Sequence, residues 1–280
     1  MEEVLRLCLA QMTSTNHHVG NIDFLEKAVR HAASEGCNLL ALPEAAGMMN
    51  KDRDHARKQI TDEQSDPYIK ACRKLAAEHD IWIQTGSTPI AHHDGRFLNH
   101  ANLIDPQGRI KARYDKIHLF DVFLEGRLAT GESNRYSPGT DAVAVNTPWG
   151  LWGMSICYDL RFPHLYRDYA KLGATVLFIP SAFTVSTGEA HWEILLRARA
   201  IETGCFVVAS AQVGSHDDGR QTFGHSLVID PWGTVLLDMG GAEPGLAVVD
   251  LDIAQVERVR AQIPSLKNER SYQMNLKRLD

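Results

Sequence analysis

Apolar runs of strand length alternate with amphipathic stretches of helix length along the first part of the chain. Residues 5–11 and 38–42 predict two strands, the second of them fully buried. Residues 22–35 between them predict a helix that Asn21 caps and Gly36 ends. Because a strand, a helix and a strand in this order make a βαβ unit, we expect a parallel sheet with a helix on its face.

The same alternation continues toward the middle of the chain. Asp66 followed by Pro67 predicts the cap and first turn of a helix that runs to His79, and residues 81–86 predict the next strand. Residues 101–104 and 109–114 flank the turn Asp105-Pro106-Gln107-Gly108. An Asp-Pro-x-Gly turn between two short apolar runs predicts a β-hairpin.

The second half of the chain repeats this pattern. The turn at Asp105 recurs at Asp230-Pro231-Trp232-Gly233, which lies 230 minus 105, or 125, positions later. Upstream, Leu-Pro-Glu at 42–44 has its counterpart in Ile-Pro-Ser at 179–181. Two halves that each build a sheet in need of cover predict an α/β fold, a four-layer α-β-β-α sandwich with an internal pseudo-twofold axis. We expect one domain over residues 1–280.

The repeat separates scaffold residues from candidates for function. His100 and His225 occupy equivalent positions, and a feature that both halves share is explained by the fold. Glu44 and Ser181, in contrast, differ at equivalent positions. Glu44 also ends an apolar strand, so its carboxylate is expected at the carboxyl end of the sheet, where α/β proteins bind ligands.

Cys157 is the candidate nucleophile. It closes the apolar run 151–156 and is followed by Pro163 and a helical pattern, which predicts a strand-to-helix turn. Free backbone N–H groups at such a turn are expected to lower the pKa of the thiol. The cysteine needs a base, and the residues alone leave alternatives open: His118 or His225 as the base of a cysteine-histidine hydrolase, or a non-catalytic module that binds metabolites or proteins.

Composition narrows the class of protein. Of the 280 residues, 44% are hydrophobic and 23% charged, enough for a large core, and the net charge of −6 with no run of Lys or Arg argues against nucleic acid or an anionic membrane as partner. No apolar run approaches the ~18 residues of a membrane span, so we expect a cytoplasmic protein. The five cysteines are widely spaced and without a CxxC pair, which favours reduced thiols and no zinc site.

Three motifs together resemble those of the nitrilase superfamily of carbon–nitrogen hydrolases. They are Leu-Pro-Glu at 42–44, Tyr-x-Lys-x-His-Leu at 114–119 and Cys-Tyr-Asp-x-Arg-Phe-Pro at 157–163. Residues 197–209 and 224–233 are similar to later segments of the family, so the resemblance covers nearly the whole chain. Residues 183–193 are most similar to the branch of amidases that act on deaminated glutathione or on ω-amides of 2-oxo acids.

The resemblance implies a role for each candidate. Glu44 is expected to be the general base, Lys116 the electrophilic stabiliser and Cys157 the nucleophile. Lys116 and the backbone N–H of Tyr158 would form the oxyanion hole. Glu132 is similar to an additional active-site glutamate, and we expect it to hydrogen-bond Lys116.

The expected reaction is hydrolysis of a non-peptide amide in a small carboxylated substrate. A thioester forms on the cysteine, ammonia leaves and water releases the acid. A nitrile or an N-carbamoyl amino acid is the alternative substrate, because the same three residues can attack either. No metal, nucleotide or organic cofactor is expected, since cysteine, acid and lysine complete the cycle.

Further residues are expected to bind the substrate or to make structural contacts. Thr184 and Thr187, in a predicted loop, and Arg161 are expected to bind the substrate, and Arg197 to pair internally. His191 and Trp192 are expected to begin a helix and to serve packing or dimer contacts. His17-His18 and His92-His93 lack a third ligand spaced for a metal. From the resemblance we expect a homodimer or larger homo-oligomer, in which residues 270–280 reach across the interface.

Overall fold

The computed structural model describes residues 2–124 and 127–278 of the chain. Strands and helices alternate in the first half, and helices begin where the sequence offers a cap: Asp66 accepts a hydrogen bond from the Ile69 amide at 2.9 Å ahead of Pro67. The elements of the first half are β1 (Val4–Gln11), α1 (His18–Ser34), β2 (Leu39–Ala41), α2 (Arg53–Arg57), α3 (Pro67–His79), β3 (Trp82–Gln84), β4 (Thr88–Ala91), β5 (Phe97–Ile104) and β6 (Ile110–Asp115).

A short two-stranded sheet and a 3-10 turn connect the halves: β7 (Asp121–Leu124), β8 (Arg127–Gly131) and η1 (Glu132–Asn134). The second half then repeats the order of the first. Its elements are β9 (Ala144–Thr147), β10 (Gly150–Met154), η2 (Cys157–Arg161), α4 (Pro163–Lys171), β11 (Ala174–Phe178), α5 (Val185–Thr203), β12 (Phe206–Ala209), β13 (Val213–Ser215), β14 (Gln221–Phe223), β15 (Leu227–Ile229), β16 (Val235–Asp238), β17 (Gly245–Asp252) and α6 (Ala254–Gln262).

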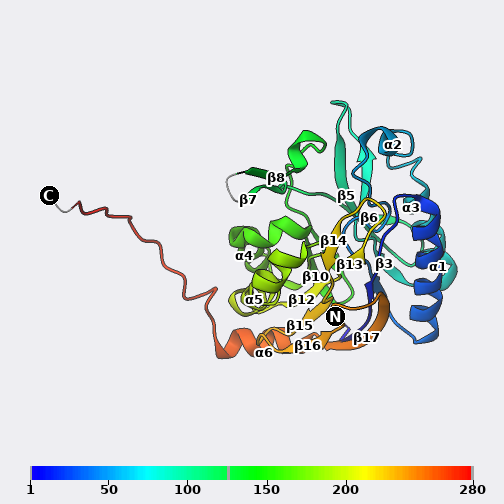
Figure 1. Ribbon diagram of the computed structural model, residues 1–280. Helices are drawn as coiled ribbons and strands as arrows, with labels where there is room; N and C mark the ends of the chain where they lie inside the picture. Colours follow the sequence, from blue (N-terminus) through cyan, green and yellow to red (C-terminus); the bar gives the residue numbers. More distant parts are fainter. Residues whose placement is uncertain (1, 125–126, 279–280) are drawn as a thin grey trace.

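Two large sheets carry the fold. The first has the order β17-β1-β2-β3-β5-β4, with β6 paired to β5, and the second has the order β16-β15-β12-β11-β10-β9. The central strands β1, β2 and β3 run parallel, as do β10, β11 and β12. Helices α1 and α3 cover the outer face of the first sheet, and α4 and α5 that of the second (Figure 1). The predicted four-layer α-β-β-α sandwich is confirmed.

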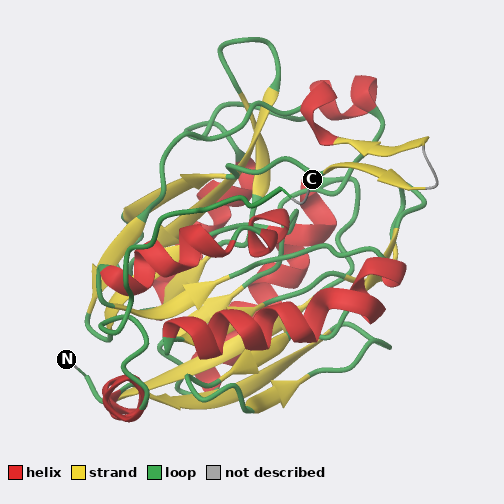
Figure 2. Ribbon diagram, turned by 90° about the vertical axis from the view of Figure 1, so that its left-hand side faces the viewer, coloured by secondary structure: helices red, strands yellow, loops and turns green. Residues whose placement is uncertain are grey.

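Alternation along the strands decides which side chains face which layer. In β1, Leu5, Leu7 and Leu9 pack with Trp152 in the core between the sheets, whereas Cys8 lies in the core beneath the helices. Figure 2, turned by 90°, shows helices packed in front of the strands of a sheet. None of the helices among the described residues is long and apolar enough to cross a membrane.

The pseudo-twofold is visible in individual hydrogen bonds. The Asp105 carboxylate accepts from the amides two and four residues ahead, at 3.0 and 2.9 Å, and Asp230 does the same at 2.9 and 2.8 Å. The two repeated histidines also match, because His100 Nδ1 lies 2.6 Å from Asp115 and His225 Nδ1 lies 3.0 Å from Asp238, each on the neighbouring strand of a hairpin. Both histidines therefore belong to the scaffold.

Two predicted helix starts were wrong. Helix α1 begins at His18 rather than at Ile22, because the side chain of Asn21 is buried and bridges two loops, accepting from the Thr15 amide at 2.8 Å and donating to the Gly47 carbonyl at 2.9 Å. Helix α5 begins at Val185, well before His191. Gly188, which favours a turn in the sequence, instead serves packing, since a Cβ there would lie 2.2 Å from the Phe223 ring.

Candidate active site

Glu44 lies just beyond the carboxyl end of β2, on a backbone that bends sharply. The next residue, Ala45, has a φ of +57°, and its amide donates to the Ser87 hydroxyl at 2.9 Å. The Glu44 carbonyl accepts from the Gln212 side chain at 2.8 Å, which ties this turn to the other half of the molecule. The carboxyl side chain is buried. Its position is therefore fixed from both sheets.

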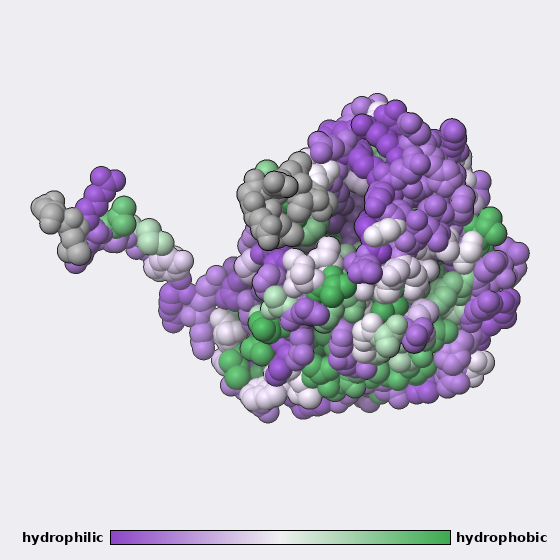
Figure 3. Space-filling model, viewed as in Figure 1, coloured by the Kyte–Doolittle hydropathy of each residue, from purple (hydrophilic) through white to green (hydrophobic). Residues whose placement is uncertain are grey.

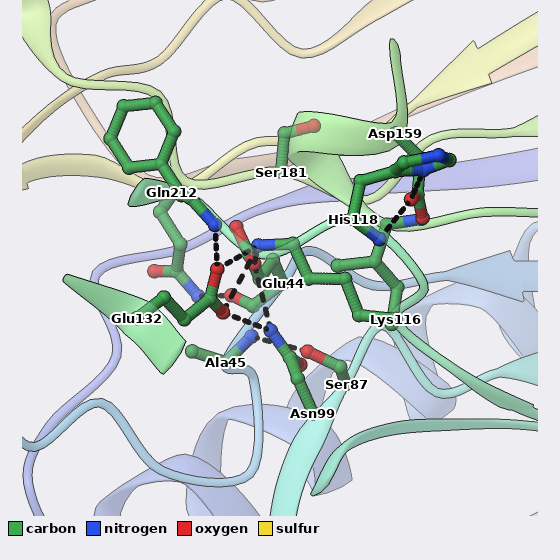
Figure 4. A network of polar contacts seen from close by, with 12 residues as sticks. Glu44, Ala45, Ser87, Asn99, Lys116, His118, Glu132, Asp159, Ser181 and Gln212 are labelled. Carbon is green, nitrogen blue, oxygen red and sulfur yellow. Dashed lines mark hydrogen bonds and ion pairs between the residues drawn. The ribbon is translucent and has the colours of Figure 1, made fainter. Parts of the chain in front are cut away.

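Lys116 follows β6 and is buried beside Glu44. Its Nζ lies 2.9 Å from Glu44 Oε1 and 2.9 and 3.1 Å from the two carboxylate oxygens of Glu132 (Figure 4). Asn99, on β5, donates to Glu44 Oε1 at 2.9 Å and more weakly to Glu132 at 3.4 Å. The expected hydrogen bond between Glu132 and Lys116 is present. The lysine thus bridges two carboxylates, and its own side chain is buried.

Glu132 is the first residue of η1. Its Oε2 also accepts from the Phe120 amide at 2.6 Å, so the carboxylate joins the chain segments on both sides of the β7–β8 connection. The charges around Lys116 decide its protonation. Burial alone would lower the pKa of Lys116, but the negative charges of Glu132, Glu44 and Cys157 raise that pKa well above its ordinary value. The side chain is therefore an ammonium at neutral pH.

Cys157 occupies the turn between β10 and η2. Its φ is +49°, a conformation that L residues rarely adopt, and its amide donates to the Pro180 carbonyl at 2.9 Å. Within residues 2–124 and 127–278, the amide of Tyr158 has no hydrogen-bond partner. The predicted strand-to-helix turn is confirmed, and it leaves a free N–H beside the thiol.

The expected lowering of the Cys157 pKa was wrong. Burial and the negative charge of Glu44 raise the pKa of this thiol well above its ordinary value, against the opposing effects of Lys116 and the Ala182 amide. The thiol is buried rather than exposed above the sheet edge. It follows that the resting cysteine is a thiol and needs a base within reach. The Glu44 carboxylate does not lie among apolar groups alone, since a lysine and an amide contact it.

A buried aspartate joins the lysine segment to the cysteine turn. Asp159 accepts from the Tyr114 hydroxyl at 2.6 Å, from the His118 amide at 3.0 Å and from the amide of Ile156 at 2.8 Å. Its Oδ1 also lies 2.7 Å from Nδ1 of His118, whose ring stacks on Phe162 with centroids 3.5 Å apart. His118 is thus bound to Asp159, and this aspartate connects the segment around Lys116 to the turn that carries Cys157.

These residues surround a pocket of about 470 Å³. Figure 3 shows a hollow with hydrophilic side chains around it on the side of the molecule where β5 and α2 lie. Among the described residues, no histidine lines the pocket. Its lining comprises Glu44, Ala45, Met48, Asn50, Lys51, Pro89, Asn99, Lys116, Phe120, Gly131, Glu132, Arg135, Tyr136, Cys157, Tyr158, Arg161, Ala182, Phe183, Thr184, Thr187 and Arg220.

The three residues expected to bind substrate all line this pocket. Thr184 and Thr187 lie in the cap and first turn of α5, not in a loop, and their hydroxyl oxygens are 2.8 Å apart. The guanidinium of Arg161 lies over the rings of Tyr158 and Phe183, at 5.9 and 5.6 Å from their centroids. These cation–π contacts do not use the N–H donors of Arg161, one of which lies 3.3 Å from His191 Nδ1.

The remaining candidates have structural contacts. Arg197 donates to the Gly233 carbonyl at 2.9 Å and pairs with Glu193 at 3.3 Å, so the predicted internal pairing is confirmed. Trp192 is buried and donates to the His225 carbonyl at 2.7 Å, which confirms its packing role. His191 lies 3.3 Å from Arg161 at the rim of the pocket.

Sequence reasoning missed Asn99, whose amide contacts both carboxylates. A signal was present: in the internal repeat Asn99 precedes His100, whereas Gly224 precedes His225. The same comparison that singled out Glu44 would have singled out Asn99. The backbone donors of Phe120 and Ala182 carry no side-chain signal, so the sequence could not reveal them.

Comparison with known proteins agrees with this geometry. Residues 6–261 match the model of the carbon–nitrogen hydrolase family. The chain is 39% identical to a deaminated glutathione amidase of Synechocystis over 92% of this chain and 95% of that protein. It is 38% identical to the nitrilase and fragile histidine triad fusion protein NitFhit of Caenorhabditis elegans, of whose length it spans 60%.

Solved structures show the same fold. The crystal structure of the nematode NitFhit protein superposes with a TM-score of 0.88 at 36% identity, over 96% of this chain and 65% of that one. An amidase from Nesterenkonia superposes with a TM-score of 0.80 at 27% identity, over 95% and 94% of the two chains. In that structure the acetamide moiety of fluoroacetamide is attached covalently to the active-site cysteine.

Proposed function

This chain belongs to the carbon–nitrogen hydrolase family and is an amidase, and we propose that it hydrolyses a small carboxylated amide of the deaminated glutathione type through a thioester on Cys157. The observation that supports this proposal most directly is the position of buried Lys116 between Glu44 and Glu132, in the pocket that Cys157 lines. The names of the relatives support the substrate class. Residues 1–280 would act as one carbon–nitrogen hydrolase domain.

In the proposed first step Glu44 removes the thiol proton, and the sulfur of Cys157 attacks the amide carbon. The raised pKa of Cys157 makes this transfer necessary at neutral pH. The carbonyl oxygen becomes an oxyanion that accepts from Lys116 Nζ and from the free N–H of Tyr158. An ammonium has three N–H donors, so one to Glu44 and one shared by the two oxygens of Glu132 leave the third for the oxyanion.

In the second half of the cycle the proton returns. Protonated Glu44 gives its proton to the leaving nitrogen, the C–N bond breaks, and ammonia or an amine departs from the thioester. Water then loses a proton to Glu44 and attacks the thioester carbon, which releases the carboxylic acid and restores the thiol. Glu132 holds Lys116 in place, and Arg161 with Thr184 and Thr187 binds a substrate carboxylate.

A substrate panel tests this proposal. Product release from deaminated glutathione, 2-oxoglutaramate, an N-carbamoyl amino acid and a simple nitrile is measured with the purified chain. We expect kcat/KM for the carboxylated amides to exceed that for the nitrile by on the order of 100-fold, since the basic pocket recognises the carboxylate. Equal or better turnover of the nitrile or the carbamoyl compound contradicts the proposed substrate.

Two rival functions receive less support from the geometry. A cysteine-histidine hydrolase needs an imidazole at the thiol, but among the described residues no histidine lines the pocket that contains Cys157. A Glu44→Gln variant would leave such an enzyme active. A non-catalytic module would carry no acyl group on Cys157 after mixing with an amide.

We also propose that two copies of the chain associate. Large apolar side chains are exposed on and beside the outer helices, where hydrophobic surface gathers in Figure 3, and residues 270–278 extend away from the body without helix or strand. These side chains are Leu172, Ile194, Ile201, Trp232 and Ile263. Sedimentation at micromolar concentration should give twice the 31.2 kDa of one chain, and removal of residues 270–280 should weaken the dimer. A monomer would contradict this.

The proposed location is the cytoplasm. All five cysteines are free and buried, which fits a reducing compartment.

A further inference from the structure

The pocket carries an excess of positive charge in an acidic protein. Five basic and two acidic side chains line it, a formal excess of three positive charges, whereas the whole chain has a net charge of −6. Both pocket acids, Glu44 and Glu132, are already bound to Lys116. The basic side chains left over are Lys51, Arg135, Arg161 and Arg220.

These four basic side chains differ in the partners that the protein itself gives to their N–H groups. Arg220 is paired with the nearly buried carboxylate of Asp218 through Nε and Nη2. Arg161 lies on two aromatic rings and contacts His191. Lys51 is an exposed residue of the rim. The remaining cation, Arg135, is the one whose surroundings call for an explanation.

Arg135 follows η1, three residues after Glu132. Its Nε and Nη2 atoms are buried, and neither has a hydrogen-bond partner among the described residues. The guanidinium carbon lies 5.9 Å from the centroid of the Tyr136 ring. Two buried guanidinium N–H groups without an acceptor are costly, and in native proteins such groups are paired with protein, water or a bound ligand. A second anion in the pocket would satisfy Arg135.

Tyr136 extends the same subsite. Burial is the main cause that raises the pKa of its hydroxyl, and the charges that act on it are those of Arg135, Glu132, Arg220 and Glu44. Tyr136 lines the same pocket as Arg135, Glu132, Arg220 and Glu44. It remains an un-ionised donor for an oxygen ligand at neutral pH.

We propose that Arg135, supported by Tyr136, binds a carboxylate on the leaving group of the substrate, so that the preferred amide carries one carboxylate on each side of the bond that breaks. The proposal rests on the proposed function, in which Arg161, Thr184 and Thr187 take the carboxylate on the acyl side. Arg161 ends η2 and Arg135 follows η1, so the two arginines reach the pocket from different segments, and we assign one carboxylate to each. Arg135 is a specificity-determining residue rather than a participant in the chemistry.

A pair of substrates that differ by one charge tests this inference. Deaminated glutathione is compared with its C-terminal carboxamide, and 2-oxoglutaramate serves as the substrate without a leaving-group carboxylate. In Arg135→Gln, KM for deaminated glutathione should rise by about 10- to 100-fold at unchanged kcat, as expected for the loss of a charge-assisted hydrogen bond made equally in ground and transition states. Turnover of the other two substrates should stay as in the wild type, and Arg135→Lys should recover part of the affinity.

The matched control is Arg53→Gln. Arg53 is an exposed arginine of α2 that donates to the Asn134 carbonyl at 3.4 Å, beside Arg135 but outside the pocket lining. Arg53→Gln should leave kcat and KM unchanged for all three substrates. An equal change of KM for deaminated glutathione and its carboxamide in Arg135→Gln, or an equal effect of Arg53→Gln, overturns the inference.

A binding measurement separates this inference from the proposed function. In Cys157→Ala, which cannot form a thioester, calorimetry with deaminated glutathione gives a dissociation constant that Arg135→Gln should raise by about 10- to 100-fold. Binding that depends on Arg135 without hydrolysis by the wild type would reject the proposed function and keep the subsite. A dissociation constant that Arg135→Gln does not change would reject the subsite, whatever substrate the wild type hydrolyses.

Discussion

Lys116 Nζ contacts both carboxylate oxygens of Glu132, at 3.1 and 2.9 Å. Glu132 follows Lys116 by 16 residues, and the β7–β8 hairpin lies between them. The hairpin returns the chain to the lysine. The two contacts of Glu132 with Lys116, here called the clamp, hold the side chain that we assign to the oxyanion.

The clamp predicts a stability effect that can be separated from activity. Lys116→Met leaves two buried carboxylates without their cation, so we expect the free energy of unfolding to fall by about 3–5 kcal/mol. The double variant Lys116→Met/Glu132→Gln should regain part of that stability, because one negative charge is gone, while turnover stays lost. Urea unfolding monitored by fluorescence measures the first quantity. A double variant no more stable than the single one would show that charge is not the cause.

Glu132 itself should matter for rate. In Glu132→Gln the lysine loses its bidentate partner, and we expect kcat to fall by roughly 10²-fold, the typical effect of a misplacement by about 1 Å. Steady-state kinetics with the best carboxylated amide gives the value. Wild-type turnover with an unchanged KM would remove Glu132 from the site.

Gly86 holds the turn that carries Glu44. It has a φ of +66°, and a Cβ there would lie 1.9 Å from the Pro43 carbonyl oxygen, so Gly86→Ala must displace the backbone next to Glu44. We expect a loss of activity of about 10²-fold in addition to about 1–2 kcal/mol of backbone strain. Circular dichroism melts and turnover are measured together.

The matched control is Gly36→Ala. Gly36 has almost the same φ, +67°, but no atom lies within 4 Å of the added Cβ. Gly36→Ala should lower stability through the same backbone strain at positive φ and keep full activity. If both variants lose activity alike, strain at positive φ is sufficient and the contact with Pro43 is irrelevant.

His100 predicts a pH dependence of stability. Burial by itself lowers the pKa of His100, but hydrogen bonds and charges from Asp115 and Glu63 outweigh it, so the folded-state pKa is raised. The stabilisation is therefore fully present below the unfolded-state pKa of about 6.5 and is lost as pH rises through the higher folded-state pKa. His100→Gln should thus lower the melting temperature more at pH 6 than at pH 9. A loss of equal size at both values would contradict a charged His100.

Layers and topology were predictable because they follow from local pattern and repetition. The local signals are the strand and helix periods, the cap at Asp66 and the two Asp-Pro-x-Gly turns. Because these signals occur in both halves of the chain, two stacked sheets could be predicted from them. The start of α1 was not predictable from Asn21. A side chain that caps a helix and one that bridges two loops look alike in sequence, and the choice depends on Gly47, a distant partner.

The candidate site was predictable as a set of residues but not as an electrostatic environment. Order and spacing singled out Glu44, Lys116 and Cys157, which the fold brings to one pocket. The direction of the Cys157 pKa depends on burial and on Glu44, which lies 113 residues away in sequence (157 minus 44). Long-range proximity of this kind has no local signature, and the same holds for the surroundings of Arg135.

The central claim is that Cys157 carries the acyl group of an amide. Wild-type protein is mixed with the best carboxylated amide, quenched in acid within the first turnover and mapped by peptide mass spectrometry. The account predicts an acyl adduct on the peptide that contains Cys157, absent in Cys157→Ala, which should also lack turnover. Hydrolysis that persists in Cys157→Ala, or an adduct on another residue, would contradict it.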